Sequence, residues 1–443
     1  MDFDLVNIID LIVPDEESFL NEEESIEIYD NCLHIMEEFI KRNPTIISDP
    51  DFEDIFDDNI KELMESIFET DVFYTDDAEE EIEEIVEQAK IDFFKDFMPI
   101  RSYPDSVILE EPDYEYVEEQ IALLKSKPQP AQRTKEWYEF RHNLITASNA
   151  YKAFDSQSTQ NQLIYEKCQP NPSSNEDNDT KVIQVQMVNV NSSLHHGQKY
   201  EPLSVMIYED TYKTRVDDFG CIQHEKYAFL GASPDGINVD RDSLRYGRML
   251  EIKNIVNREI DGIPKKEYWI QMQLQMEVCD LDECDFLETK FTEYENADAF
   301  WSDAMSDKRK GVIAYFHTKD GKPYYVYKPL ECKKQTDIDE WENNTLETYE
   351  NEPYNYIYIK TIYWKLEVLS CILVLRDRIW FKNNIGQLGD VWKIVEKERI
   401  TGYEHRAPKK RKMEYYAKPF IEKETQGCLL KFNKIIKVDT DHL

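Results

Sequence analysis

The chain lacks the features that mark secreted, membrane-spanning and zinc-binding proteins. Its eight cysteines form no CxxC pair and no zinc-ligand spacing, so we expect reduced thiols, most of them in the core. The start, Met1-Asp2-Phe3-Asp4, is acidic where a signal peptide is basic, and no apolar run is long enough to cross a bilayer. These absences predict a soluble, intracellular protein.

Positive charge is also scarce, since 52 Lys and Arg stand against 91 Asp and Glu, for a formal net charge of −39. Affinity for duplex DNA comes largely from basic residues, so this balance argues against DNA binding. The acidity is unevenly spread, however. Residues 1–120 hold 40 acidic and 6 basic residues, a net charge of −34, which leaves 51 acidic and 46 basic residues, a net charge of −5, for the remainder. The objection therefore applies to the N-terminal quarter alone.

Residues 1–122 are predicted to form an acidic, all-helical domain. Apolar residues recur every three or four positions, which indicates amphipathic helices and not a disordered acidic tail. The three stripes are Ile26, Tyr29, Leu33, Met36 and Ile40; Phe56, Ile60, Leu63 and Ile67; and Ile82, Val86, Ala89, Phe93 and Phe97. Such a domain suits protein contacts. The alternative is a DNA mimic that covers a basic cleft until substrate or a partner displaces it.

The rest of the chain alternates helical and strand patterns. Residues 123–132 are typical of a linker, 133–405 of an α/β domain with a polar surface loop at 169–180, and 406–443 of a basic tail. Strands are predicted at 221–232, 248–253 and 283–294, and a hairpin at 312–327. From residue 357 we expect strands and then a helix through residue 399. These elements predict a mixed α/β sheet flanked by helices.

Two short motifs in this domain carry its chemistry. The turn sequence Ser233-Pro234-Asp235-Gly236 is followed, after fourteen residues, by Glu251-Ile252-Lys253 on a predicted strand. On a strand, the first and third residues of the second motif share a face, and Ile252 faces the core. Two carboxylates can hold Mg²⁺ at a phosphodiester, while an ammonium orients the attacking water or offsets charge on the phosphate. The pattern is typical of nuclease chemistry.

Further elements stand in order around these motifs. Glu201 lies near the start of an amphipathic stretch, and Gln271 lies beside the apolar positions of a predicted helix. Upstream, Arg141 precedes Ile145-Thr146-Ala147-Ser148, which indicates a new helix capped by Ser148. A guanidinium beside a helix start favours an anion. We therefore expect a phosphate pocket near the carboxylates.

With these five elements in order, the sequence resembles the YqaJ-like viral recombinases and the bacteriophage lambda exonuclease group of PD-(D/E)xK nucleases. The resemblance runs from about residue 132 to 294, with weaker similarity to about 399. It implies a PD-(D/E)xK, restriction-endonuclease-like fold and an origin in a large DNA virus. It also implies Mg²⁺-dependent 5′ to 3′ digestion of one strand of duplex DNA, with Mn²⁺ able to substitute, in recombination, repair or end processing.

The resemblance also assigns roles to single residues. Lys253 is expected to assist the nucleophile, and Gln271 to complete the site. The terminal 5′ phosphate is expected at Arg141 and Ser148, with Ser233 as a further contact. The expected metal-holding positions are Asp235, Glu251, Glu201 and the backbone carbonyl of Ile252. Further expected DNA contacts are Gln273, Lys409, Lys410, Arg411 and Lys412, the last four of which could instead form a nuclear localisation signal or a solvated tail.

The sequence leaves alternatives open. An endonuclease or flap nuclease of the same fold would use the same residues, and a non-catalytic DNA-end-binding scaffold would recruit partners through the acidic domain. The expected partners are duplex DNA ends and a single-strand annealing protein, and the resemblance suggests a homotrimer without membrane contact. The expected location is the host cytoplasm, a viral factory or the nucleus.

Overall fold

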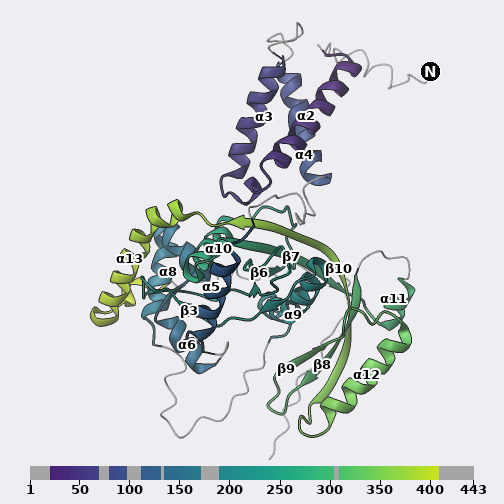
Figure 1. Cartoon of the computed structure of the whole chain (residues 1–443), viewed down its shortest axis with the longest axis vertical. Helices are drawn as coiled ribbons and strands as arrows, with labels where there is room; N and C mark the ends of the chain where they lie inside the picture. The colour runs from purple at the N-terminus through teal and green to yellow at the C-terminus, as the bar shows by residue number, and fades with distance from the viewer. Residues whose placement is uncertain are drawn as a thin grey trace, which may run out of the picture.

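The computed structural model describes residues 20–68, 79–96, 111–130, 134–170, 189–303 and 309–408. It consists of an N-terminal helical bundle above a larger α/β body (Figure 1). The basic run Lys409 to Lys412 and most of the expected loop at 169–180 lie outside the described residues. Within the described ranges, no helix is long and apolar enough to cross a membrane.

The predicted helical N-terminal region is confirmed. Its elements are α2 (Glu22–Arg42), the short η1 (Ile46–Ser48), α3 (Phe52–Phe68) and α4 (Glu79–Asp96). Their core includes Phe56 and Phe93, whose rings stack with centroids 6.0 Å apart. The predicted stripes are partly wrong, because Ile26 is 55% and Leu63 44% exposed. The buried stripes are instead Ile28, Cys32, Met36 and Ile40 on α2 and Phe52, Phe56, Ile60 and Met64 on α3.

The α/β body is built on a seven-stranded mixed sheet, as predicted. Its strand order is β2-β5-β6-β7-β10-β8-β9, and the central pair β6 and β7 is parallel while the other pairs are antiparallel. The bounds are β2 (Val216–Asp217), β5 (Gly236–Asn238), β6 (Met249–Asn254), β7 (Glu283–Glu293), β10 (Ile357–Leu375), β8 (Lys310–His317) and β9 (Pro323–Tyr327). A small second sheet contains β1 (Ile145–Thr146), β4 (Leu230–Ala232) and β3 (Ile222–Gln223).

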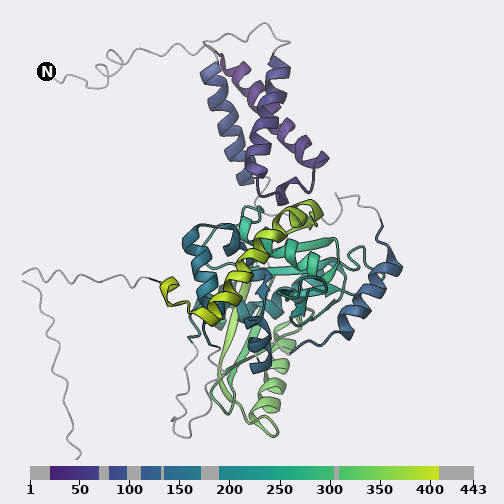
Figure 2. The ribbon, with the colours of Figure 1, turned by 90° about the vertical axis from the view of Figure 1, so that its left-hand side faces the viewer.

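Helices cover both faces of the larger sheet (Figures 1 and 2). Helix α9 (Ser193–Tyr212) packs against Leu250, Ile252 and Leu287, whereas α10 (Lys266–Cys279) packs against Phe286 on the opposite face. Because side chains alternate along a strand, α10 covers the face that carries Glu251. The other helices of the body are α5 (Tyr114–Ser126), α6 (Lys135–His142), α7 (Ala147–Ala150), η2 (Tyr151–Phe154), α8 (Gln157–Cys168), α11 (Ala297–Ser302), α12 (Gln335–Glu350), α13 (Arg378–Thr401) and η4 (Glu404–Arg406).

Most of the predicted strands match the observed ones within two residues. Strands β6 and β7 lie where strands at 248–253 and 283–294 were predicted, and β8 and β9 form the predicted hairpin. The predicted strand at 221–232 is wrong in its middle, because β3 and β4 are separate strands joined by a turn. At this turn, His224 Nδ1 accepts a hydrogen bond from the backbone of Lys226. The C-terminal strand pattern corresponds to one 19-residue strand, β10.

Helix α5 packs on the α/β body. Gln120 Nε2 donates to the carbonyl of Cys279 at 2.7 Å, and the Tyr116 hydroxyl donates to Asp280 Oδ2 at 2.6 Å. Val117 lies over Gly247, where a Cβ would come within 2.5 Å of it. The predicted boundary between residues 122 and 123 therefore falls inside a helix of the body. We propose that the N-terminal domain ends before α5.

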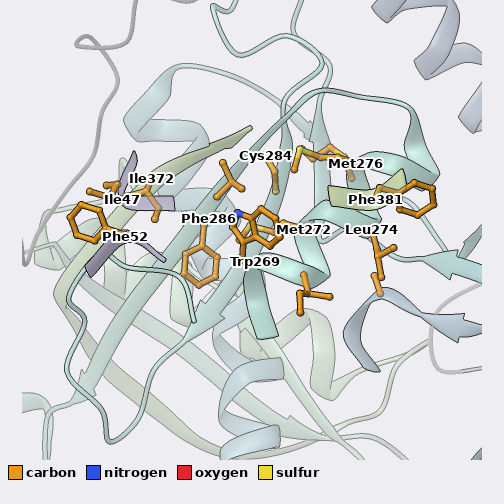
Figure 3. Close-up of a cluster of buried hydrophobic side chains, with 14 of the residues drawn as sticks. Ile47, Phe52, Trp269, Met272, Leu274, Met276, Cys284, Phe286, Ile372 and Phe381 are labelled. Carbon is orange, nitrogen blue, oxygen red and sulfur yellow. The ribbon is translucent and has the colours of Figure 1, made fainter. Parts of the chain in front are cut away.

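The base of the N-terminal bundle rests on the sheet. Figure 3 shows Ile47 and Phe52 beside Ile372 of β10, with Phe286 next in the same buried cluster. Ile372 pairs with Phe286, and Phe286 with Glu251, across three neighbouring strands. Paired residues share one face of a sheet. The acidic bundle is thus anchored two strands from Glu251, on the same face.

Candidate active site

Glu251 lies in the middle of β6 and is 1% exposed. Its Oε1 accepts hydrogen bonds from Lys253 Nζ and, at 2.8 Å, from Gln271 Nε2. Its Oε2 accepts one from Gln275 Nε2 at 2.7 Å. As predicted, Glu251 and Lys253 share a face of the strand, and Gln271 reaches the same place from α10. A buried carboxylate with three such donors is held in a fixed orientation.

Asp235 lies at the turn between β4 and β5, beside Glu251. Its Oδ2 accepts a hydrogen bond from the backbone N–H of Ile252 at 2.7 Å, and its own N–H donates to the carbonyl of Leu250. Burial raises the pKa of Asp235 well above its ordinary value, and the negative charges of Glu251 and Glu201 raise it further. The three predicted carboxylates therefore come together, from two strand regions and a helix. A bound cation would relieve their repulsion.

Lys253 supplies the one ammonium recorded at this cluster in the described part of the chain. Burial alone would lower its pKa, but the carboxylates of Glu251 and Asp235 raise the pKa above its ordinary value, so Lys253 stays charged. The ammonium lies 5.0 Å from the centre of the Tyr268 ring and 3.4 Å from Gln271 Oε1. It is thus a fixed positive charge beside the carboxylates.

The half-buried amide of Asn254 fixes the helix that carries Glu201. At the end of β6, Asn254 Oδ1 accepts hydrogen bonds from the hydroxyls of Ser204 at 2.7 Å and Thr289 at 2.6 Å. Asn254 Nδ2 donates to the carbonyl of Gly197 at 3.0 Å. Because Glu201 lies between Gly197 and Ser204, these bonds hold its helix turn against the strand of Glu251 and Lys253.

The predicted phosphate-binding residues also meet. Arg141 donates from Nη1 to Ser233 Oγ and from Nη2 to Ser148 Oγ, each at 3.2 Å. Its guanidinium lies 4.3 Å from the centre of the Trp137 ring. A guanidinium with two hydroxyls is suited to a phosphate group. We call Arg141, Ser148 and Ser233 the Arg141 pocket.

The expected helix cap at Ser148 is wrong. The N-cap of α7 is Thr146, which forms a capping box with Asn149. Ser148 lies in the first turn, and this position leaves its exposed hydroxyl directed at Arg141. Ser148 therefore contributes to the Arg141 pocket through its side-chain hydroxyl and not as the cap of a helix.

One turn joins the Arg141 pocket to the carboxylates. Ser233 and Asp235 are separated only by Pro234, and Gln275 Nε2 donates both to the carbonyl of Ser233 at 3.3 Å and to Glu251. Gln275 is a site residue that was not predicted from the sequence. Its spacing of four residues from Gln271 is a signal that could have indicated it, because such residues share a helix face.

The expectation that Gln273 contacts DNA is wrong. It is 1% exposed, its Nε2 donates to the carbonyl of Leu375 at 2.8 Å, and its Oε1 accepts from the N–H of Asp377 at 2.6 Å. Both ends of the amide are therefore used to join α10 to the turn between β10 and α13. Its position in the interior leaves no surface for DNA.

The carboxylates fit a hard, oxygen-preferring cation such as magnesium better than a softer metal that prefers nitrogen or sulfur. In the described part of the chain, no group of three or more His, Cys, Asp or Glu side chains is placed to hold a metal by itself. Magnesium needs fewer, since it keeps several waters and uses one or two carboxylates with substrate oxygens. Asp235, Glu251 and the carbonyl of Ile252 offer only oxygen, with Glu201 as a further acid nearby. This donor set fits Mg²⁺.

A mixed sheet with buried carboxylates and a lysine beside an anion pocket is the architecture that the resemblance implied. Residues 136–282 match the model of the YqaJ-like viral recombinase domain. This segment includes every site residue predicted from the sequence in the described part of the chain.

The chain also resembles proteins of viral and bacterial origin. It is 28% identical over 346 residues to the uncharacterized protein R354 of Acanthamoeba polyphaga mimivirus, covering 70% of this chain and 60% of that protein's length. This relative agrees with the expected origin in a large DNA virus.

Two solved structures were also matched. They are the alkaline exonuclease of Laribacter hongkongensis, with 18% identity, a TM-score of 0.35 and coverage of 60% of this chain and 94% of that one, and a phage related exonuclease from Haemophilus somnus 129PT, with 11% identity, a TM-score of 0.31 and coverage of 59% and 96%.

Proposed function

We propose that the protein is a Mg²⁺-dependent DNA exonuclease that digests duplex ends in the 5′ to 3′ direction, during viral recombination, repair or end processing. The observation that carries this proposal is the Ser233-Pro234-Asp235 turn. It contributes one residue to the carboxylate cluster and one to the Arg141 pocket. A strand's end and a scissile phosphate could therefore be bound side by side.

The roles of the carboxylates follow from their environment. Asp235, Glu251 and the carbonyl of Ile252 would hold Mg²⁺, with Glu201 as a further ligand; Mn²⁺, which accepts the same oxygen donors, should substitute. When bound, the ion supplies an activated water and neutralises charge on the phosphate.

The neighbouring side chains prepare the site for this chemistry. Gln271 and Gln275 hold Glu251 in one orientation from α10. Lys253 stays protonated beside them, so its ammonium orients the nucleophile or offsets the negative charge that develops on the phosphate.

The Arg141 pocket is the basis for the proposed 5′ to 3′ direction of digestion. A terminal 5′ phosphate carries close to two negative charges and three acceptor oxygens, which match one guanidinium and two hydroxyls. With the terminal phosphate held there, the adjoining phosphodiester would lie toward Asp235. Binding of this kind favours ends over internal sites and favours phosphorylated over hydroxyl ends.

The partners are proposals as well. Duplex ends are the substrate that the Arg141 pocket favours, and a single-strand annealing protein would take up the 3′ overhang that the reaction leaves. A homotrimer would add processivity if the N-terminal bundle leaves its interface open.

Three single variants test the site. Asp235→Ala, Glu251→Ala and Lys253→Ala should each lower digestion of 5′-phosphorylated linear duplex in Mg²⁺ by at least about a hundredfold, the loss typical of a removed charge-stabilising group. Lys213→Ala, which removes an exposed lysine paired with Asp210 on α9, is the control. Unchanged digestion in all three variants would eliminate this site.

Two alternatives have their own readouts. An endonuclease or flap nuclease would cleave a covalently closed circle, which an exonuclease leaves intact. A non-catalytic scaffold would bind duplex ends without digesting them in any metal. The intact set of Asp235, Glu251 and Lys253 favours an enzyme, because a scaffold has no need of all three.

A further inference from the structure

Two cations hold the end of the helix that carries Arg141. Lys167 Nζ donates to the carbonyl of Arg141 at 2.9 Å. Arg399, from α13, donates to the carbonyl of His142 at 2.9 Å and to Asn143 Oδ1 at 3.1 Å. Cations at a helix C-terminus satisfy its last carbonyls and interact favourably with its dipole. The backbone of α6 is thus fixed just where its guanidinium enters the pocket.

Lys167 is an unusual residue for this task, because it is only 7% exposed. It is the penultimate residue of α8, and its own carbonyl accepts two hydrogen bonds from Arg399, at 2.9 and 2.8 Å. Its ammonium has three donors, and one recorded acceptor among the described residues, the carbonyl of Arg141. Three cations therefore meet in one place.

We propose that Lys167 is a second cation of the Arg141 pocket. Its ammonium contacts the backbone of Arg141 and strengthens the binding of a terminal phosphate. Lys167 acts on the phosphate through Arg141 and through its charge, so it is a positioning residue. This inference rests on the proposed function, because it presupposes that the pocket takes a terminal phosphate.

The charged neighbours make Lys167 sensitive to pH. Burial, with the positive charges of Arg141 and Arg399, lowers the pKa of Lys167 to about 7, against the opposing effects of Glu166 and Cys221. The nearby His142 also has a lowered pKa, because of burial and the positive charges of Arg399 and Lys167. An anion in the pocket favours the protonated lysine. Phosphate binding should therefore take up a proton and weaken as pH rises through about 7.

The test compares digestion of duplexes with 5′-phosphate and 5′-hydroxyl ends, in Mg²⁺, between about pH 6.5 and 9, where the phosphate stays largely dianionic. The wild type should lose about tenfold of its preference for phosphate across this range, the order expected for one nearby charge. Lys167→Met should show, at every pH, the low preference that the wild type reaches at about pH 9. Lys167→Arg, which stays charged, should show a preference that does not vary with pH. The control, Lys152→Met, removes a lysine of η2 that pairs with Glu166, the residue before Lys167 on α8, and should behave as the wild type.

Calorimetry on the wild type gives an independent readout that needs no variant to fold. In two buffers of different ionisation enthalpy at about pH 7.5, without metal, the 5′-phosphorylated duplex should bind with uptake of a proton and the hydroxyl duplex without it. Absence of uptake, or a Lys167→Met variant that keeps the preference and its pH dependence, would overturn the role of Lys167. A wild type with no preference, or a preference that survives Arg141→Ala, would instead overturn the pocket itself.

Discussion

Asp235 is held where its charge is disfavoured, since burial, Glu251 and Glu201 all raise its pKa. A carboxyl whose pKa is raised by folding costs the folded state stability as the pH rises above the lower pKa that this carboxyl has in the unfolded chain. Without a cation, the free energy of unfolding at neutral pH should therefore be lower than it would be with an uncharged residue at this position. The prepared site is a balance between stability and function at a single residue.

Asp235→Asn should accordingly raise the melting temperature of the metal-free protein at pH 7.5, by roughly a few degrees, while abolishing digestion. Mg²⁺ should raise the melting temperature of the wild type, because it binds only the folded state, but not that of the variant. Thermal melts with and without Mg²⁺ check both effects. A variant that melts lower than the metal-free wild type would contradict the electrostatic explanation.

Glu288 is a second buried acid, paired in register with Lys253 on the neighbouring strand and bonded to Arg258. Burial raises its pKa to about 6, against the lowering effect of Arg258. Its contribution to stability is therefore full below the unfolded pKa of about 4.3, and is lost as pH rises through about 6. Glu288→Gln should flatten the fall in melting temperature between pH 5 and 8. An unchanged fall would show that Glu288 is not its cause.

At the scale of elements, helix α9 is positioned by its bonds to β6. Ser204→Ala removes the hydroxyl that donates to Asn254, so the turn that carries Glu201 should loosen. We expect kcat to fall about tenfold and the free energy of unfolding by about 1 kcal/mol. Thr211→Ala is the matched control, because among the described residues this hydroxyl bonds within α9, to the carbonyl of Ile207. Equal effects on kcat in the two variants would remove the positioning role.

The parts that could be predicted from the sequence depend on short spacings. Asp235, Glu251 and Lys253 lie in compact motifs, and strand periodicity placed the last two on one face. Lys167 could not be predicted, because its role arises where α6, α8 and α13 meet, far apart in sequence. The prediction that Gln273 contacts DNA failed because α10 is buried on several sides. A polar residue there joins α10 to its neighbours instead of facing solvent.

At the scale of the whole molecule, the acidic bundle stands on the sheet face that carries Glu251. Its anchor, Ile47 and Phe52 on Ile372, places this negative charge two strands from Glu251. We propose that the bundle lowers the affinity for DNA that approaches over this face and thereby favours approach from the Arg141 pocket.

Neutralising exposed acids on the bundle tests this proposal. The triple variant Glu53→Gln, Asp54→Asn, Asp58→Asn should bind duplex DNA more tightly at low salt, and the gain should vanish when salt screens the charges. The control neutralises Asp337, Glu340 and Glu347 on α12, which are also exposed. Equal gains in the two variants would mean general repulsion, and no gain would exclude an electrostatic role for the bundle.

The most direct test of the central claim, that a metal-dependent cleavage site adjoins a pocket for the strand's end, is one comparison of rates. Digestion of linear duplex in Mg²⁺ is measured with 5′-phosphate and 5′-hydroxyl ends, for the wild type and Arg141→Ala. We predict that the wild type digests phosphorylated ends at least about tenfold faster, as expected for a charge-assisted contact, and that Arg141→Ala loses this preference. A wild type that digests both ends equally fast would contradict the account.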